Sequence, residues 1–279
     1  MGNDTAGRTP DSAGTWCVTG AAGSIGRALR AHLASRGVPL VSLDLVDANP
    51  AGPNDRTVRA DVRDLAALEA AFAGCVGVIH LGGFADEADF HDLAEVNIVG
   101  TYHVLEAARR AGVGRVVFAS SNRLTGSYPE SVTVDPSMPP RPDGFYGVSK
   151  VAGEALCQVY TDKFGLSTIG LRIGSYEERP TTARESHTWL SHGDALRAFD
   201  AAMSTAVQHA VFYAVSRNRD RWWSLAEGEA IGFVPVDDAA DFGDLGTVPA
   251  GVPQGGVFAS PAYSLDRMQS HNTPGATAP

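Results

Sequence analysis

The chain has 279 residues, of which 44% are hydrophobic and 19% charged, and a chain of this length and composition can bury the core of one α/β domain. Its formal net charge of −10, with no run rich in Lys or Arg, argues against nucleic acid or an anionic membrane surface as a partner. No apolar stretch approaches the roughly 20 residues that span a bilayer, and the N-terminus lacks the layout of a signal peptide, so we expect a cytoplasmic protein.

Short β-rich runs alternate with helical patterns through the first two thirds of the chain. Residues 1–13 and 270–279 are small, polar and punctuated by Pro and Gly, which predicts mobile ends. The predicted strands are residues 15–19, 40–44, 57–60, 77–80, 115–119 and 167–172. The predicted helices are residues 25–35, 65–72, 94–111 and 146–164. This alternation predicts an α/β fold, a doubly wound parallel sheet with crossover helices on both faces.

The pattern changes after the last of these strands. A loop rich in Pro, Thr, Arg and Glu covers residues 176–187. An amphipathic helix is predicted near residues 195–209 and a further strand at residues 211–215, followed by aromatic-rich turns. We therefore predict one NAD(P)-binding domain over residues 14–269, with a small C-terminal substrate lobe built mainly from residues 174–262.

The cysteines and two of the histidines show no metal-ligand spacing. Cys17, Cys75 and Cys157 are far apart, odd in number and without a C-x-x-C pair, as is typical of reduced, packed thiols in a reducing compartment. His187 and His192 have no evident partner, which favours packed or surface roles. We predict no metal site.

Gly20, Gly23 and Gly26 stand in the string TGAAGSIG (19–26), which follows the first predicted strand and opens a helix. Glycines at this spacing allow a tight turn, a close approach of the backbone to a pyrophosphate, and close packing of helix on strand. The N–H groups at the start of the helix then face the phosphates. This context predicts a Rossmann-type dinucleotide loop that includes Ser24 and Ile25, with an ordinary Gly-rich turn as the alternative.

Asp44 ends the second predicted strand, where a carboxylate can accept both ribose hydroxyls of NAD and repel the 2′-phosphate of NADP. NAD is therefore the predicted cofactor, and Asp47 is the competing residue for this role. Strand ends in open α/β sheets line the ligand crevice. On that ground we expect five more residues at the cofactor: Asp61 and Val62 near the adenine amine, and Leu81, Gly82 and Gly83 along its length.

Tyr146 and Lys150 in the string YGVSK (146–150) stand at i and i+4 on one helix face. Because the reference pKa of Tyr is near 10, a fall of ~3 units needs ~4 kcal/mol of preferential stabilisation of the phenolate. A neighbouring Lys and a positive nicotinamide ring are groups that can supply it. Ser121, at the end of the fifth strand, can donate a hydrogen bond to the same substrate oxygen. We predict Tyr146 as the acid/base, whereas the alternative is a surface pair and a strand-end serine.

Together these features resemble the extended branch of the short-chain dehydrogenase/reductase superfamily, in which TGAAGSIG, Asp44, NIVGT (97–101), Ser121 and YGVSK occur in this order. More specific strings between about residue 15 and residue 262 resemble the bacterial uronate dehydrogenases of the NAD-dependent epimerase/dehydratase family. These strings are HLGG (80–83), FASSN (118–122), RPDGFYGVSK (141–150), RIGS (172–175), HTWLSHGD (187–194), RWW (221–223) and QGGVF (254–258). The resemblance also implies Asn97 and Ile173 as cofactor-binding residues.

The resemblance implies NAD-dependent oxidation of the anomeric C1 hydroxyl of a hexuronic acid, such as glucuronate or galacturonate, to the aldarolactone. It implies that Tyr146 takes the hydroxyl proton, that Ser121 orients the oxygen, and that Lys150 binds the nicotinamide ribose. It further implies that the sugar is bound by Ser121, Asn122, Ser175 and Arg184. Arg184 would pair with the carboxylate, and an anionic substrate in a chain of charge −10 does need a local cation of bidentate geometry.

Ala85 and Arg123 depart from the family, which typically has Ser and His at these positions beside the sugar. A lost hydroxyl donor removes one hydrogen bond, worth roughly 0.5–1.5 kcal/mol, while Arg123 adds a charge that can clash with the sugar or bind another anionic group. The open alternatives are a dehydrogenase of another sugar, lactone or hydroxy acid, a sugar-nucleotide epimerase or dehydratase, and a non-catalytic NAD-sensing regulator. Trp222 and Trp223 either close over the sugar, pack in the lobe or meet another subunit, and a homo-oligomer is expected by analogy.

Overall fold

A parallel sheet of seven strands forms the centre of the protein, in the order β3-β2-β1-β4-β5-β6-β9. The computed structural model describes residues 14–268, so the predicted ends, 1–13 and 270–279, lie outside the described residues. The strands are β1 (Thr15–Thr19), β2 (Leu40–Asp44), β3 (Asp55–Arg59), β4 (Cys75–His80), β5 (Arg115–Ser121), β6 (Ser167–Ile173) and β9 (His209–Ala214). The prediction of a doubly wound α/β fold is confirmed.

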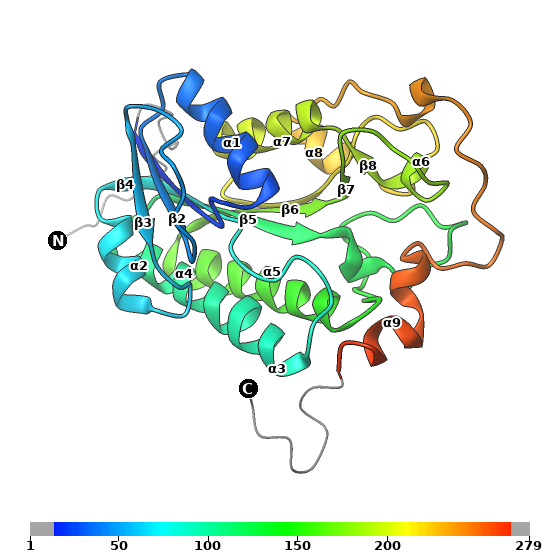
Figure 1. Cartoon of the computed structure of the whole chain (residues 1–279), viewed down its shortest axis with the longest axis horizontal. Coiled ribbons are helices and arrows are strands. Elements are labelled where there is room, and N and C mark those ends of the chain that lie inside the picture. Colours follow the sequence, from blue (N-terminus) through cyan, green and yellow to red (C-terminus); the bar gives the residue numbers. More distant parts are fainter. Residues whose placement is uncertain (1–13, 269–279) are drawn as a thin grey trace, which may run out of the picture.

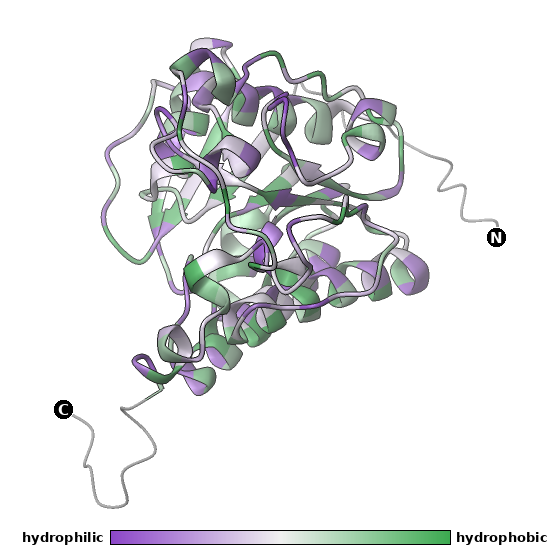
Figure 2. Cartoon of the chain, turned by 90° about the vertical axis from the view of Figure 1, so that its right-hand side faces the viewer, coloured by the Kyte–Doolittle hydropathy of each residue, from purple (hydrophilic) through white to green (hydrophobic). Residues whose placement is uncertain are grey.

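Helices cover both faces of this sheet (Figure 1). One face carries α1 (Ser24–Ser35), α7 (His192–Ser204) and α8 (Ala226–Ala230), and the other carries α2 (Leu65–Phe72), α3 (Phe90–Leu93), α4 (Gly100–Arg110) and α5 (Phe145–Phe164). Neighbouring residues of β1 point into different cores, because Trp16 and Val18 pack with α1 and α7 whereas Cys17 packs with α2 and α4. In Figure 2 green and purple stretches alternate along the lower helices, as in helices with one face against the sheet.

The segment predicted as one helix over residues 94–111 is irregular. It starts with α3, continues as a π-helical segment, Ala94–Val99, and only then becomes α4. A π-helical turn inserts an extra residue and is often found near functional sites. Asn97 lies in this segment.

The helix predicted near residues 195–209 begins and ends earlier, as α7. The Ser191 hydroxyl accepts a hydrogen bond from the Asp194 amide at 2.9 Å and caps its first turn. At the other end the Arg115 guanidinium donates to four carbonyl oxygens, those of Ala202, Met203, Thr205 and Val207. These bonds stabilise a turn where the periodicity predicted more helix, and β9 therefore starts before the predicted strand at 211–215.

Part of the chain beyond β6 lies at one end of the sheet (Figure 1). It contains a two-stranded parallel sheet, β7 (Ser175–Tyr176) with β8 (Trp189–Leu190), together with α6 (Glu185–Thr188) and α9 (Pro261–Leu265). Three 3-10 turns complete the secondary structure, at Asn122–Thr125, Ala239–Phe242 and Gly256–Ala259. The loop predicted over residues 176–187 thus holds α6 in its last part.

The described part of the chain has no helix that is both long and apolar enough to cross a membrane. Cys17, Cys75 and Cys157 are free and buried. Burial raises the pKa of all three thiols, that of Cys75 to about 11, which keeps them protonated and unreactive at neutral pH.

Candidate active site

One cavity of about 1450 Å³ runs along the carboxyl ends of the strands, across the point where the strand order reverses between β1 and β4. In open α/β sheets this is the place where ligands bind. All the predicted cofactor and substrate residues except Asn97 line it: Gly20, Gly23, Ser24, Ile25, Gly26, Asp44, Asp61, Val62, Leu81, Gly82, Gly83, Ala85, Ser121, Asn122, Arg123, Tyr146, Lys150, Ile173, Ser175 and Arg184.

The turn from β1 into α1 has no room for a side chain at Gly20 or Gly26. Gly20 has φ +68°, and a Cβ there would lie 2.7 Å from the backbone nitrogen of Gly82. A Cβ at Gly26 would lie 2.3 Å from the Gly20 oxygen. Gly23 is the N-cap of α1, and no side chain caps the first turn. This backbone can therefore approach a pyrophosphate closely and present its N–H groups to it.

Asp44 lies at the end of β2, where its carboxylate accepts hydrogen bonds from the backbone amides of Ala22, at 2.8 Å, and Val46, at 3.2 Å. It thus ties the glycine loop to the neighbouring strand and also faces the cavity. The competing Asp47 does not line this cavity, and its side chain is 85% exposed beside Arg59. Position therefore favours Asp44 for the ribose.

Asn97 is buried and lies behind the cavity wall. Its side-chain oxygen accepts a hydrogen bond from the Phe84 amide at 2.8 Å, and its nitrogen donates to the Phe84 carbonyl at 3.1 Å and to the Ser149 hydroxyl at 3.0 Å. Both ends of the amide are therefore engaged by the protein. The resemblance implied direct cofactor contact, whereas the structure places Asn97 where it holds the Gly83–Phe84 turn against α5.

Tyr146 and Ser121 lie together in the middle of the cavity. Tyr146 is 7% exposed, and burial raises the pKa of its phenol to about 12, opposed by a hydrogen bond from Ser121 and by the charge of Arg123. The Lys150 ammonium donates to the Ala119 carbonyl at 2.9 Å and lies 5.5 Å from the centre of the Tyr146 ring. Burial lowers the pKa of Lys150 to about 8. In the protein alone the pKa of Tyr146 is thus raised, contrary to the expected lowering by Lys150.

Arg184 provides a cation at the substrate end of the cavity. Its Nε donates to the Gln254 carbonyl at 2.8 Å, and a terminal nitrogen donates to the Ser175 hydroxyl at 3.3 Å. Burial lowers its pKa to about 10, while Asp143 and Glu185 act on it only through longer-range attraction. No acidic side chain among residues 14–268 forms an ion pair with it. Arg184 is therefore a charged group that lacks a counter-ion in the part of the chain that the structure describes.

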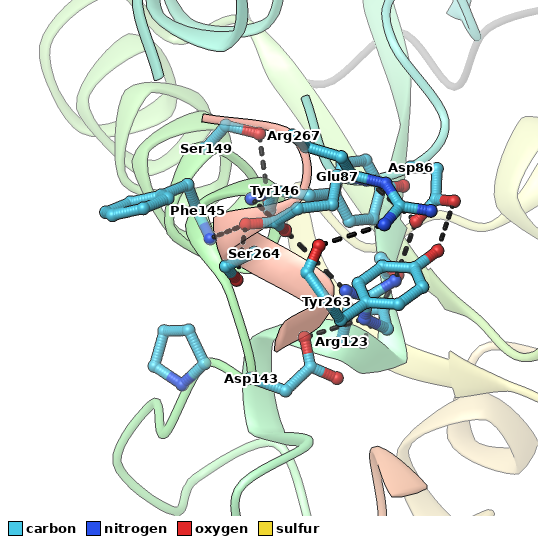
Figure 3. Close-up of polar contacts among 12 residues, drawn as sticks. Asp86, Glu87, Arg123, Asp143, Phe145, Tyr146, Ser149, Tyr263, Ser264 and Arg267 are labelled. Carbon is cyan, nitrogen blue, oxygen red and sulfur yellow. Dashed lines mark hydrogen bonds and ion pairs between the residues drawn. The ribbon is translucent and has the colours of Figure 1, made fainter. Parts of the chain in front are cut away.

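Arg123 is in the opposite situation (Figure 3). Its guanidinium forms ion pairs with Asp143 at 2.6 Å, Asp86 at 3.1 Å and Glu87 at 3.6 Å, and it lies 4.3 Å from the centre of the Phe258 ring. The sequence suggested a charge that could clash with the sugar or bind a second anion. Three carboxylates of the chain already surround that charge, so it is not available to a further anion.

Four other residues discussed in the sequence analysis lie outside the cavity: His187, His192, Trp222 and Trp223. Trp223 stacks on Tyr213 with ring centres 5.2 Å apart, and Trp222 stacks on His187 at 4.3 Å. Both tryptophans are almost fully buried. His192 stacks on Tyr176 at 4.4 Å. The two tryptophans belong to the hydrophobic core and do not line the cavity.

A family model described as the NAD dependent epimerase/dehydratase family matches residues 16–209. The chain belongs to this family. Among its relatives, uronate dehydrogenase of Agrobacterium fabrum is 42% identical over 81% of this chain and 85% of its own, and L-arabinose 1-dehydrogenase (NAD(P)(+)) of Haloferax volcanii is 38% identical over 80% and 96%. The crystal structure of a mutant uronate dehydrogenase from Agrobacterium tumefaciens complexed with NAD superposes with a TM-score of 0.83, at 39% identity, over 88% of this chain and 97% of that one.

Several residues that shape the site of this family member escaped the sequence prediction. Glu87, Asp143, Gln254, Phe258 and Tyr263 contact Arg123 or Arg184, or the residues that hold them. Phe258 stood inside the string QGGVF, which was a signal for resemblance without a role. Gln254 stood in the same string, and Asp143 stood in RPDGFYGVSK, likewise without a role. Nothing local in the sequence distinguishes Glu87 and Tyr263 from solvated residues.

Proposed function

We propose that the protein is an NAD-dependent dehydrogenase that oxidises the C1 hydroxyl of a cyclic hexuronic acid to the aldarolactone. The observation that carries this proposal is Arg184, a partly buried cation without a carboxylate partner in the described part of the chain, at the end of the cavity that also holds Tyr146. Leaving such a charge unpaired is costly, and a guanidinium matches a carboxylate in bidentate geometry. A sugar that carries a carboxylate supplies the missing anion.

The cavity suits NAD on the evidence of its own backbone. The glycine loop leaves space that a Cβ would fill, and Asp44 stands where the 2′-hydroxyl of NAD can donate and a 2′-phosphate would be repelled. NAD, when bound, supplies the acceptor for the hydride of C1 and a positive ring that stabilises a nearby phenolate. Lys150, which faces the same part of the cavity, is placed to hold the nicotinamide ribose.

Tyr146 takes the proton of the C1 hydroxyl in this proposal. Ser121 shares a hydrogen bond with the phenol and can orient the sugar oxygen at the same time, with Asn122 next to it. The raised pKa of Tyr146 keeps the phenol protonated in the protein alone, so it becomes a base only in the loaded site.

At the other end of the sugar, Ser175 and Arg184 bind the carboxylate. Because Arg123 is already neutralised, Arg184 is the cation left without a carboxylate partner among the described residues at the substrate end, which fits a substrate with one carboxylate there. Ala85 lines the cavity with a methyl group and donates no hydrogen bond to the sugar. The small lobe, residues 174–262, supplies this half of the site.

We also propose that the protein is a cytoplasmic homo-oligomer. Three free, buried thiols are typical of a reducing compartment. Val148 and Val159 on α5 are each about two fifths exposed, which is consistent with a helix face that meets another subunit.

The test is to mix the purified protein with NAD and glucuronate, galacturonate, glucose, arabinose or a nucleotide sugar, and to follow NADH formation. The proposal predicts NADH and an aldarolactone with the uronates. Turnover of a neutral sugar without any turnover of a uronate would overturn the substrate assignment. Interconversion of nucleotide sugars without net NADH would instead identify an epimerase.

A further inference from the structure

Glu87 ties the first turn of α5, the helix that carries Tyr146, to the rest of the site. One carboxylate oxygen accepts a hydrogen bond from the Phe145 amide at 2.8 Å, and the other accepts one from the Tyr146 amide at 3.0 Å. The N-cap residue, Gly144, has no side chain with which to do this. The amides at the start of the catalytic helix are therefore satisfied by a carboxylate from a distant loop, which also suits the positive end of the helix.

The C-terminal helix α9 reaches the same carboxylate. The Ser264 hydroxyl donates to Glu87 at 3.1 Å, and the neighbouring Tyr263 hydroxyl donates to Asp86 at 2.5 Å. In Figure 3 dashed lines join Tyr263 to Asp86, and Ser264 and Phe145 to Glu87. One carboxylate thus joins α9 to the helix of the acid/base.

Arg123 contacts the same acidic pair and α9. It pairs with both acids and lies 5.6 Å from the centre of the Tyr263 ring. The side chain of Glu87 is fully buried, so its position is set by these partners and not by water. The segment just before α9, residues 256–258, lines the cavity itself. The C-terminal segment therefore contributes to the site in two ways. Residues 256–258 line the cavity, and α9 contacts Glu87, which binds the first turn of α5.

We propose that α9 is a positioning element of the catalytic centre, which acts through Glu87 on the first turn of the helix that carries Tyr146. This inference deepens the proposed function and rests on it for its kinetic consequence. A five-residue helix has little stability of its own, so α9 holds its place through its side-chain contacts. A shift of about 1 Å at an acid/base can cost roughly a hundredfold in rate, so this contact bears on turnover more than on binding.

The test uses the full chain with Ser264→Ala, Tyr263→Phe and both together. Ser264→Thr retains the hydroxyl and serves as the conservative rescue. Ser204→Ala and Tyr102→Phe, on exposed parts of α7 and α4, are matched controls for the loss of a serine or tyrosine hydroxyl. Two readouts are combined: kcat and KM with NAD and glucuronate, and hydrogen exchange of the backbone amides in residues 143–150 without ligands.

We expect kcat of the double variant to fall by roughly five- to thirtyfold with a KM for glucuronate within about twofold of the wild type. We also expect faster hydrogen exchange at the amides of Phe145 and Tyr146 in the double variant. Ser264→Thr should have the kcat and the exchange rates of the wild type. Wild-type kcat and wild-type exchange in the double variant would overturn the inference, as would an equal loss in the two controls. If the wild type does not oxidise uronates, the proposed function fails, and the exchange readout still decides whether α9 holds the first turn of α5.

Discussion

The guanidinium of Arg184 donates to the backbone carbonyl of Gln254 at 2.8 Å, and this bond sets the direction of the free cation of the substrate site. Gln254 is itself fully buried. Its side-chain oxygen accepts a hydrogen bond from the Trp223 indole at 3.1 Å, and its nitrogen donates to the Val132 carbonyl at 2.7 Å. The orientation of this cation therefore depends on the buried contacts of Gln254 with Trp223 and Val132.

Trp223→Phe tests this connection. The smaller ring can still stack on Tyr213 but leaves the Gln254 oxygen without its donor, so we expect the KM for glucuronate to rise roughly threefold to tenfold and the free energy of unfolding to fall by about 1–3 kcal/mol. The KM for NAD should stay at the wild-type value. Trp222→Phe is the matched control, because Trp222 stacks on His187 and does not contact Gln254. An equal rise of KM in both variants would argue against a specific role for Gln254.

Asp44→Asn tests the choice of cofactor. The amide retains one acceptor for the loop but loses the charge, so we expect the KM for NAD to rise roughly tenfold and NADP to become usable. Steady-state kinetics with both cofactors measures this. Asp47→Asn removes the same charge from the exposed competitor and should leave both values as in the wild type. A larger effect at Asp47 than at Asp44 would reverse the assignment.

Tyr146→Phe should lower kcat by roughly a hundredfold to ten-thousandfold and leave the affinity for NAD unchanged, because only the proton acceptor is lost. The pH profile gives an independent check. Since the phenol must lose its proton and its pKa is raised, kcat/KM should increase with pH through the neutral range. Ser121→Ala removes a hydrogen bond that lowers this pKa, so the rise should move to higher pH. If the pH profile of kcat/KM is the same in Ser121→Ala as in the wild type, Ser121 does not influence the pKa of Tyr146.

His80 should make the protein less stable in acid. Its ring is fully buried between the hydroxyls of Thr19 at 2.8 Å and Thr101 at 3.1 Å, and burial lowers its pKa from 6.5 to about 3. Below pH 6.5 the unfolded chain binds a proton at this residue that the folded chain does not, so stability is complete above pH 6.5 and decreases as the pH falls toward 3. The added slope is at most about 1.4 kcal/mol per pH unit. Urea unfolding of the wild type and of His80→Gln between pH 6.5 and about 4.5 should show this slope only in the wild type; identical slopes would contradict the assignment.

The features predicted from the sequence depend on short-range spacing. The glycine loop occupies eight consecutive residues, and Tyr146 and Lys150 are about one helical turn apart. In each case the spacing alone determines how the residues lie relative to one another. The strands were placed by their β-rich runs, and the order of strands and helices was enough for the doubly wound sheet. Asp44 and Ser121 followed from their places at strand ends.

The features that were missed depend on contacts between distant segments. Glu87 is 59 residues from the Tyr146 amide that it binds and 177 residues from Ser264. No local periodicity places such residues together, because the chain segments after β4, β5 and β9 bring them into contact. The same holds for Arg123, which looks like a free charge in the sequence. Its three carboxylate partners come close to it only in the folded chain.

The most direct test of the central claim is the ratio of kcat/KM for glucuronate to kcat/KM for glucose, in the wild type and in Arg184→Ala. The two sugars differ at the carboxylate, and Arg184 is the cation that we assign to it. We predict that the wild type prefers glucuronate. In Arg184→Ala the ratio of the two kcat/KM values should fall roughly tenfold to hundredfold, mainly because the KM for glucuronate rises. Arg36→Ala, on the surface, should keep the wild-type ratio. An unchanged preference in Arg184→Ala would contradict the claim that this residue selects a sugar acid.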